Sequence, residues 1–532
     1  MKKGKIILYI LGLILYAVLY YIILPPINLT SPLFWFFIGI GVVIYFFANA
    51  SDVEWVVTKN NVTVKSAPKY VWIPVMLIPV VAVLIVLINV AVGPFFNAHS
   101  WANRISVDNG NFTEDIKEVD FKKIPLLDKD SSQKLGDRTM GQMAEYVSQY
   151  YVSNLYTQIN YNDDIIRVTP LEYDGLIKWF INHKSGINAY ITVNSVDGAS
   201  NLIKMDKGMK YMPSAYFNED LKRHLRFTYL FDIFGESRFE IDNEGKPYWI
   251  TPVLGYTGVG TKTKVIATII TDPITGESTK YKIEDVPTWV DNAFYADLII
   301  EQVNNWGEYQ KGFWNSKFGQ KNVVNTTEGY NYLALNDDIY LYTGITSVVS
   351  DESNLGFILT NLRTGQTTFY DVPGAEEYSA MDSAKGQVQH MNYKSTFPLL
   401  INLNNRPTYL VSLKDDAGLV KMYAFIDVQD YQKVVVTDSS LGINKAASNY
   451  LTQYGEEVKK NIFTTKEITI KSITSAVKEG NTYYYIVDTN NTKYKAHINI
   501  SDELPYLTTG SKIEVTYFED SSIIDINSIK IG

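Results

Sequence analysis

Two pairs of adjacent carboxylates are the residues of this chain whose types and spacing come nearest to acid–base chemistry. They are Asp163-Asp164 and Asp337-Asp338. A general acid and a general base need two such groups held close together. Both pairs, however, stand at the same place in two repeats of the chain, between two strand-like runs. This equivalence favours a structural role in hairpin turns over catalysis.

A third acidic pair, Asp351-Glu352, lies in a loop and has no counterpart elsewhere in the chain. It is the best carboxylate candidate for catalysis, and a solvated loop is the simpler explanation. His224 lies between Arg223 and Arg226 in a segment with an amphipathic helical pattern. A basic helix face explains this histidine, and an anion-binding or catalytic histidine is the alternative.

Local motifs for a cofactor are missing from the sequence. Its five histidines are scattered and it has no cysteine, so no zinc, haem or thiol site can be built from neighbouring residues. No serine elbow, phosphate-binding loop or dinucleotide glycine motif occurs in the context that each requires. We therefore predict no cofactor, no metal site and no catalytic residue.

One stretch, Trp306–Asn322, combines aromatic residues with glycines and three lysines. Exposed aromatic side chains beside cations are typical of recognition surfaces. The alternative is that these rings fill the contact between the second and third repeats. The predicted binding residues are Trp306, Tyr309, Phe313, Trp314 and Lys317.

Charge and composition restrict the class of partner. The 532 residues carry a net charge of −9, and because the first 93 residues carry +4, the remainder carries −13. An acidic surface repels phosphate polymers, so we predict no nucleic-acid partner. An exported protein without disulfides must be stabilised by core burial, which a chain of this length can supply. The absence of cysteine favours a bacterial envelope protein.

Three apolar runs predict transmembrane helices, namely Ile6–Leu24, Leu33–Ala48 and Tyr70–Val92. A bilayer core requires about 20 apolar helical residues. The first run is longer than a signal-peptide core and is followed by Pro25-Pro26 instead of a cleavage site, so we expect it to be retained. The second run is shorter, and a re-entrant segment is the alternative for it.

Lysine placement predicts the orientation of these helices. Three lysines precede the first run and three more lie between Asn49 and Lys69, whereas the loop between the first two runs has none. Positively charged loops stay in the cytoplasm. We therefore predict an integral protein of the cytoplasmic membrane, with its N-terminus in the cytoplasm and all residues after 93 extracytoplasmic. The segment between Asn49 and Lys69 also reads as a small β-hairpin.

A turn motif recurs four times beyond the membrane segment. It consists of Asp or Asn, two residues, Thr or Asp, then Gly, between two strand-like runs. The first side chain can accept bonds from backbone N–H groups, and glycine tolerates the positive φ that closes the turn. The fourth instance has tyrosine instead of glycine, so we expect a different turn there. The instances are Asn194–Asp197–Gly198, Asp272–Thr275–Gly276, Asn361–Thr364–Gly365 and Asp427–Asp430–Tyr431.

Each motif follows a second hairpin and a helix-like segment, so the repeated unit is one helix and about four antiparallel strands. The expected helices are Arg138–Leu155, Ala215–Phe234, Val290–Gly307 and Ala375–Met391. Over residues 136–440 this unit, with its D-x-x-T-G hairpin, resembles the PepSY module of bacterial exported proteins. The whole ectodomain resembles that of a group of membrane-anchored surface proteins of Gram-positive bacteria, some of which carry a colicin-V-production (CvpA-family) label.

The last 65 residues read as five strands, with Gly510-Ser511-Lys512 before a late strand. This pattern resembles a small oligonucleotide- or oligosaccharide-binding (OB-like) barrel. The predicted class is thus a membrane-anchored α+β protein. The predicted parts are a membrane anchor (1–93), a connector (94–135), four repeats (136–210, 211–287, 288–373 and 374–440), a helical linker (441–465) and the barrel (466–532).

Two hypotheses for function follow. The first is a non-enzymatic binding or scaffold protein of the bacterial envelope, with a protein or cell-wall partner that the sequence does not identify. The PepSY resemblance implies one specific version, the regulation of an exported peptidase. The alternative is an envelope hydrolase that acts on glycan or peptide through carboxylates brought together by the fold. The oligomeric state is left open.

Overall fold

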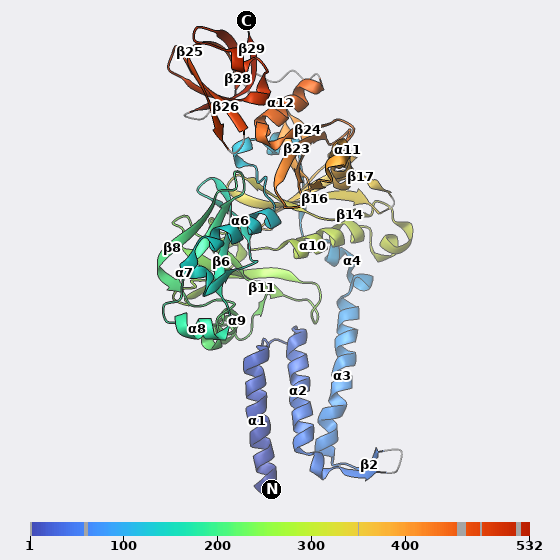
Figure 1. Ribbon diagram of the computed structural model, residues 1–532. Helices are drawn as coiled ribbons and strands as arrows, with labels where there is room; N and C mark the ends of the chain where they lie inside the picture. The colour runs from blue at the N-terminus through green and yellow to red at the C-terminus, as the bar shows by residue number, and fades with distance from the viewer. Residues whose placement is uncertain are drawn as a thin grey trace.

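The computed structural model describes residues 3–57, 62–348, 350–454, 464–478, 481–517 and 523–531. It begins with three long apolar helices, α1 (Lys3–Ile23), α2 (Pro32–Ala48) and α3 (Lys69–Val92), which lie side by side at one end of the molecule (Figure 1). All three are long and apolar enough to cross a membrane. Pro74 and Pro79 lie inside α3 without ending it.

Strands β1 (Glu54–Val57) and β2 (Val62–Ser66) pair between α2 and α3 and confirm the predicted hairpin. Its expected turn at Lys59-Asn60-Asn61 lies outside the described residues.

Four sheets with one topology form most of the remaining molecule. In each sheet, one edge of a long strand pairs with a short strand and a medium strand. The other edge pairs with a third strand, which in turn pairs with a fourth, and all these pairs are antiparallel. Sheet 1 contains β4 (Tyr150–Val152), β5 (Thr157–Tyr161), β6 (Asp164–Tyr173), β7 (Ile187–Asn194) and β8 (Ser200–Met209). Sheet 2 contains β9 (Ile233–Phe234), β10 (Arg238–Ile241), β11 (Pro247–Gly255), β12 (Lys264–Thr271) and β13 (Ser278–Tyr281).

Sheets 3 and 4 repeat this arrangement, and sheet 3 has two additional edge strands. Sheet 3 contains β14 (Val324–Thr326), β15 (Asn331–Leu335), β16 (Asp338–Ser347), β17 (Ser350–Asn361), β18 (Thr367–Tyr370), β19 (Gly374–Ala375) and β3 (Val107–Gly110), the last paired in parallel with β18. Sheet 4 contains β20 (Lys394–Ser395), β21 (Leu399–Leu403), β22 (Arg406–Lys414), β23 (Val420–Asp427) and β24 (Val434–Asp438).

The recurring turn joins two neighbouring strands in every sheet: β7 to β8, β12 to β13, β17 to β18 and β23 to β24. Its side-chain hydrogen bonds are the predicted ones. In sheet 2, the Asp272 carboxylate accepts bonds from the backbone N–H groups of Ile274 (2.7 Å) and Thr275 (3.2 Å), and Gly276 has φ +79°. Asn194 and Asn361 accept the equivalent two bonds in sheets 1 and 3. Gly198 and Gly365 also have positive φ, which confirms the role predicted for the glycines.

The fourth turn differs as expected. Asp427 accepts the same two N–H bonds, from Gln429 and Asp430. The Asp427 N–H, however, bonds the carbonyl of Lys433, whereas in sheet 2 the Asp272 N–H bonds the carbonyl of Glu277, one residue earlier in the turn. Tyr431 is not among the residues with positive φ. The fourth loop therefore closes one residue later, because tyrosine does not replace the left-handed glycine.

Helices complete each repeat, but several are shorter than predicted. The predicted helix Arg138–Leu155 is helical only as far as Val147, with a break after Gly141, and Tyr150–Val152 is instead strand β4 on the edge of β6. The second helix, α9, covers only Leu221–Thr228, and Ile233–Phe234 pairs with β11. The helices are α6 (Lys129–Gly141), α7 (Ala144–Val147), α8 (Leu176–Asn182), α9, α10 (Ala296–Tyr309), α11 (Glu377–Gln387) and α12 (Ile443–Gln453), with short helices η3 (Phe217–Glu219) and η5 (Asn315–Gly319).

The repeats share cores in pairs. One continuous cluster joins sheet 1 residues such as Ile191 to sheet 2 residues such as Trp249. A second cluster joins Tyr342 of sheet 3 to Phe425 of sheet 4, and the connector contributes Phe112, among other residues, to it. The connector, which also contains α4 (Pro94–Ala102), α5 (Phe112–Asp115) and η2 (Phe121–Lys123), is thus part of the packed core.

The chain ends in a closed barrel of five strands at the far end of the molecule from the apolar helices (Figure 1). Its strand order is β25-β26-β27-β29-β28, with β28 returning to β25 and β27 parallel to β29. This is the predicted OB-like barrel. Its strands are β25 (Thr464–Lys478), β26 (Asn481–Asp488), β27 (Lys493–His497), β28 (Lys512–Tyr517) and β29 (Ile524–Ile531).

The β11–β12 loop connects sheet 2 to the apolar helices. Asn89 lies in the last turn of α3, and its side chain exchanges two hydrogen bonds with the backbone of Val259, at 3.0 and 2.8 Å. The N–H of Gly260 donates to the carbonyl of Thr30, between α1 and α2 (2.9 Å). These contacts fasten the loop to α3 and to the connection between α1 and α2.

Candidate functional site

The aromatic stretch Trp306–Asn322 divides into a packed base and an exposed tip. At the base, Tyr309 is 7% exposed and packs with Ala98 and Ala102 of α4. Trp306 is half-buried and its ring lies 6.2 Å from that of Phe369 in sheet 3. The base therefore fills contacts of α10 with α4 and sheet 3, not the contact between the second and third repeats that we considered.

The tip carries the exposed rings. Trp314 is 61% exposed and Phe318 is 78% exposed, and their rings stack at 5.7 Å. Phe95 of α4 meets Phe313 at 5.2 Å and Trp314 at 5.5 Å in edge-to-face contacts. Aromatic pairs favour such geometry. We call the set Phe95, Phe96, Phe313, Trp314 and Phe318 the aromatic ledge.

Lys317 is held in place beside the aromatic ledge. Its Nζ lies 2.6 Å from Oε1 of Glu308 and 5.9 Å from the centre of the Phe313 ring. Both contacts orient the cation along the rings, and the ion pair offsets its charge. The structure thus brings Phe313, Trp314 and Lys317 together at the tip. Trp306 and Tyr309 lie apart from them in the packed base. Phe95 and Phe96 were missed because they follow the third apolar run in sequence.

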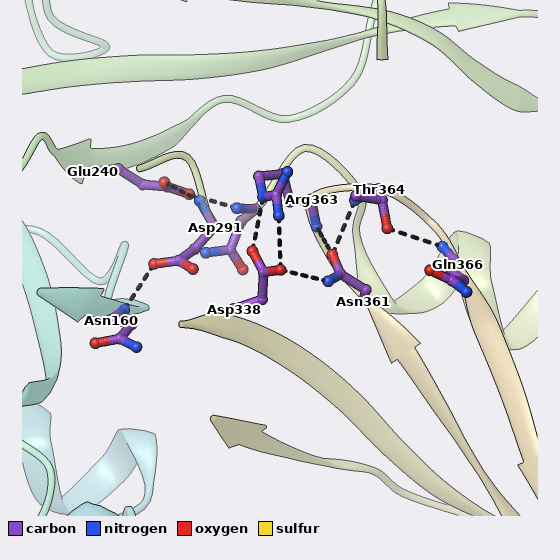
Figure 2. Close-up of polar contacts among 9 residues, drawn as sticks. Asn160, Glu240, Asp291, Asp338, Asn361, Arg363, Thr364 and Gln366 are labelled. Atoms are coloured by element: carbon purple, nitrogen blue, oxygen red, sulfur yellow. Dashed lines mark hydrogen bonds and ion pairs between the residues drawn. The ribbon is translucent and has the colours of Figure 1, made fainter. Parts of the chain in front are cut away.

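A second group of polar residues lies where sheets 1, 2 and 3 meet (Figure 2). Glu240 of β10 is fully buried, and its carboxylate accepts bonds from the N–H groups of Asp291 (2.9 Å) and Asn292 (3.0 Å). Asp291 is also buried and accepts a bond from the N–H of Asn160 in β5 (2.7 Å). These bonds join two sheets to the segment before α10.

The same region contains an ion pair between a buried carboxylate and a partly buried guanidinium. Asp338 accepts two bonds from the guanidinium of Arg363, both 2.7 Å, and one from the Asn361 side-chain amide (2.8 Å). Asn361 is the first residue of the recurring turn, so this pair fixes the turn of sheet 3 against the start of β16 (Figure 2). We call Asn160, Glu240, Asp291, Asn292, Asp338, Asn361 and Arg363 the polar junction.

Burial dominates the electrostatics of the polar junction. It raises the pKa of Glu240 to about 7, although the N–H donors favour the charged form. Burial and the neighbouring Glu240 charge raise the pKa of Asp291 well above its usual range. Raised carboxyl pKa values also occur in catalytic acids. Here both side chains are enclosed between sheets, so the arrangement suits cross-linking of the repeats better than contact with a substrate.

Among the other residues considered for catalysis, Asp163, Asp337 and His224 have structural roles. Asp163 and Asp337 are the second left-handed residues of two-residue hairpin turns, with φ of 71° and 72°. The His224 ring nitrogen donates to the carbonyl of Gly276 (2.7 Å) and so ties α9 to the recurring turn. The side chains of Asp351-Glu352 lie outside the described residues. Within the described parts of the chain, no group of three or more His, Asp or Glu residues could hold a metal ion.

Comparisons with known proteins leave the family open. No family model matches the sequence, and no curated protein matches it. Among solved structures, the chain is similar to the Bacillus megaterium YpeB C-terminal domain, at 9% sequence identity and a TM-score of 0.11. That match covers 47% of this chain and 98% of the other. A similarity of this strength supports no conclusion about function.

Proposed function

We propose that this protein is a membrane-anchored scaffold that binds a partner protein through the aromatic ledge. The observation that carries the proposal is the exposure of Trp314 and Phe318 on a segment whose base is packed. Rigid, exposed aromatic rings are common at the centres of protein interfaces. Helix α4 and the buried Tyr309 hold the rings in place, so little ordering is required on binding.

The position of the aromatic ledge suggests the kind of partner. Phe95 and Phe96 follow the last residue of α3 by three and four residues, so the ledge begins close to the membrane. A partner must therefore reach the region next to the membrane surface. The membrane-proximal segment of another membrane protein fits this requirement better than a distant cell-wall polymer. The regulation of an exported, membrane-bound peptidase, which the PepSY resemblance implies, is one specific version of this function.

Site-specific photo-crosslinking in intact cells tests the proposal. A photoreactive phenylalanine analogue replaces Phe318, and in a control it replaces Tyr506 of the barrel, which is similarly exposed at 82%. We expect one discrete protein adduct from position 318 and not from position 506. Trp314→Ala in the same chain should remove that adduct. Adducts only with lipid, or the same adducts from both positions, would contradict the proposal.

The extracytoplasmic placement of the repeats is part of the proposal and has its own test. The chain has no cysteine, so a single cysteine introduced at Ser66 or Ser440 is the only thiol that can be labelled. Position 66 lies in the predicted cytoplasmic loop, and position 440 lies in the predicted extracytoplasmic part. A membrane-impermeant thiol reagent on intact cells should label the cysteine at 440 and leave the one at 66 unlabelled. Labelling of both, or of 66 alone, would contradict the orientation predicted from the lysines.

A further inference from the structure

Helix α8 exposes an apolar face that the sequence pattern did not reveal. Leu176, Ile177, Phe180 and Ile181 are 49–73% exposed, whereas Trp179 on the opposite side is buried. Positions 177, 180 and 181 lie on one side of a helix. Soluble surfaces rarely place four large apolar side chains together without a covering partner.

Helix α8 is fixed to the short helix η3. The indole N–H of Trp179 donates to Glu219 (3.0 Å), and the Trp179 ring lies 5.6 Å from those of Tyr216 and Phe217. Phe217 is itself 59% exposed. The apolar side chains of α8 and η3 therefore belong to one rigid edge of the molecule.

This edge adjoins the end of the first apolar helix. The Tyr21 hydroxyl donates to the Asn218 side chain (3.3 Å), and the Phe227 ring of α9 lies 6.1 Å from that of Tyr20 and 6.0 Å from that of Tyr21. Tyr20 and Tyr21 are in the last turn of α1. Aromatic residues at the ends of transmembrane helices lie at the level of the lipid headgroups. The residues that contact them lie at the same level.

Two arginines fasten α9 to α1. Arg226 is buried, and its Nε donates to the carbonyl of Leu24 (3.1 Å). The Nε of Arg223 donates to the carbonyl of Tyr21 (3.2 Å), and its guanidinium lies 4.3 Å from the centre of the Tyr21 ring. These contacts fix the height of α8 relative to α1. Figure 1 shows α8 and α9 at the edge of the sheets that faces the apolar helices.

We propose that α8 is a membrane-docking element whose apolar face inserts into the interfacial layer of the lipid bilayer on the side of the repeats. Leu176, Ile177, Phe180 and Ile181 enter this layer, and Phe217 extends the contact toward α1. Short segments with an apolar face and polar flanks bind bilayers in this way. The bilayer is the occupant because the patch is continuous with the end of a membrane-spanning helix. This inference is independent of the aromatic ledge.

Spin labelling of the full-length chain in lipid nanodiscs tests the proposal. Ile177→Cys provides one labelling site, and Val477→Cys in the barrel is the matched control, since the two side chains are 73% and 72% exposed. The native chain has no cysteine, so each label is unique. We expect label 177 to collide with lipid-soluble oxygen and to be shielded from a water-soluble nickel chelate. Label 477 should show the reverse.

Two results would overturn the inference. One is a label at 177 that is as accessible to the nickel chelate as the label at 477, because the face then lies in water. The other is a label at 177 that is shielded from both reagents, because the face is then covered by protein. Phe180→Cys repeats the measurement on the same face of α8, so that a single perturbing label does not decide the outcome.

Discussion

The polar junction buries charged side chains, whereas the aromatic ledge exposes apolar ones, and both arrangements are unusual in a folded protein. In the polar junction, Glu240, Asp291 and Asp338 are buried between sheets. In the aromatic ledge, Trp314 and Phe318 are exposed. Charged residues are rarely buried without partners, and large exposed apolar patches are uncommon on soluble surfaces.

The comparison separates a structural use of polar groups from the binding use that we propose for apolar ones. Each buried carboxylate of the polar junction meets backbone N–H groups or a guanidinium from another segment, so its charge serves to join repeats. The exposed rings of the ledge meet mainly one another and leave their outer faces free of protein. Changes in the junction should therefore affect stability, and changes at the tip of the ledge should affect binding.

The largest expected effect is that of Asp338→Ala. The variant removes three hydrogen bonds to the buried Asp338 carboxylate and leaves the partly buried guanidinium of Arg363 without its partner. Because hydrogen bonds to charged groups contribute about 1.5–3 kcal/mol each, we expect a loss of about 3–5 kcal/mol. Unfolding of the full-length protein by urea measures the change. Asp164→Ala is the matched control, since Asp164 occupies the same hairpin position in sheet 1 but is exposed. Equal losses for the two variants would refute a special role for the pair.

The base of the aromatic stretch should behave like the polar junction and not like its own tip. Tyr309→Ala removes a buried ring from the contact between α10 and α4, and we expect a loss of about 3 kcal/mol or more. Tyr309→Phe keeps the ring and should lose far less. Urea midpoints of the two variants provide the test. A neutral Tyr309→Ala would show that the base is not a packing element.

A smaller, pH-dependent effect should come from Glu240. Its pKa is 4.5 in an unfolded chain and is raised to about 7 by burial, so the folded state retains a proton that the unfolded state releases. Stability should therefore fall as pH rises from about 4.5 to 7, by roughly 1–3 kcal/mol. Glu240→Gln cannot ionise, so the variant should gain stability relative to the native chain over this range. Parallel pH profiles would contradict the predicted burial cost.

The parts of this fold that depend on local chemistry were predictable from sequence. The three apolar helices follow from their composition, and the recurring turn follows from an Asp or Asn side chain and a glycine a few residues later. A different type of fourth turn was also foreseeable because Tyr431 replaces that glycine, although its closure one residue later was not predicted. Each of these features is determined by residues close together in the chain.

The sites depend on contacts between distant residues and were only partly predictable. Trp306 and Trp314 are the same residue type eight positions apart, yet one packs on sheet 3 and the other is exposed. Glu240 and Asp291 show no distinguishing pattern, because the sheets that bury them come together only in the folded chain. Helix α8 escaped notice because its seven residues lie between two strands and its apolar face resembles a core face.

The smallest effect on stability, and the largest on binding, is expected for the double variant Trp314→Ala/Phe318→Ala. Both rings are mostly exposed, so their removal should change the free energy of unfolding by less than about 1 kcal/mol. The same variant should lose the crosslink from a photoreactive phenylalanine analogue at position 96, which lies in the same ledge and is not one of the two substituted positions. A large loss of stability would place these rings among the packing residues. Unchanged stability with an unchanged crosslink would show that the exposed rings do not form the binding surface, and the contrast with the polar junction would then concern folding alone.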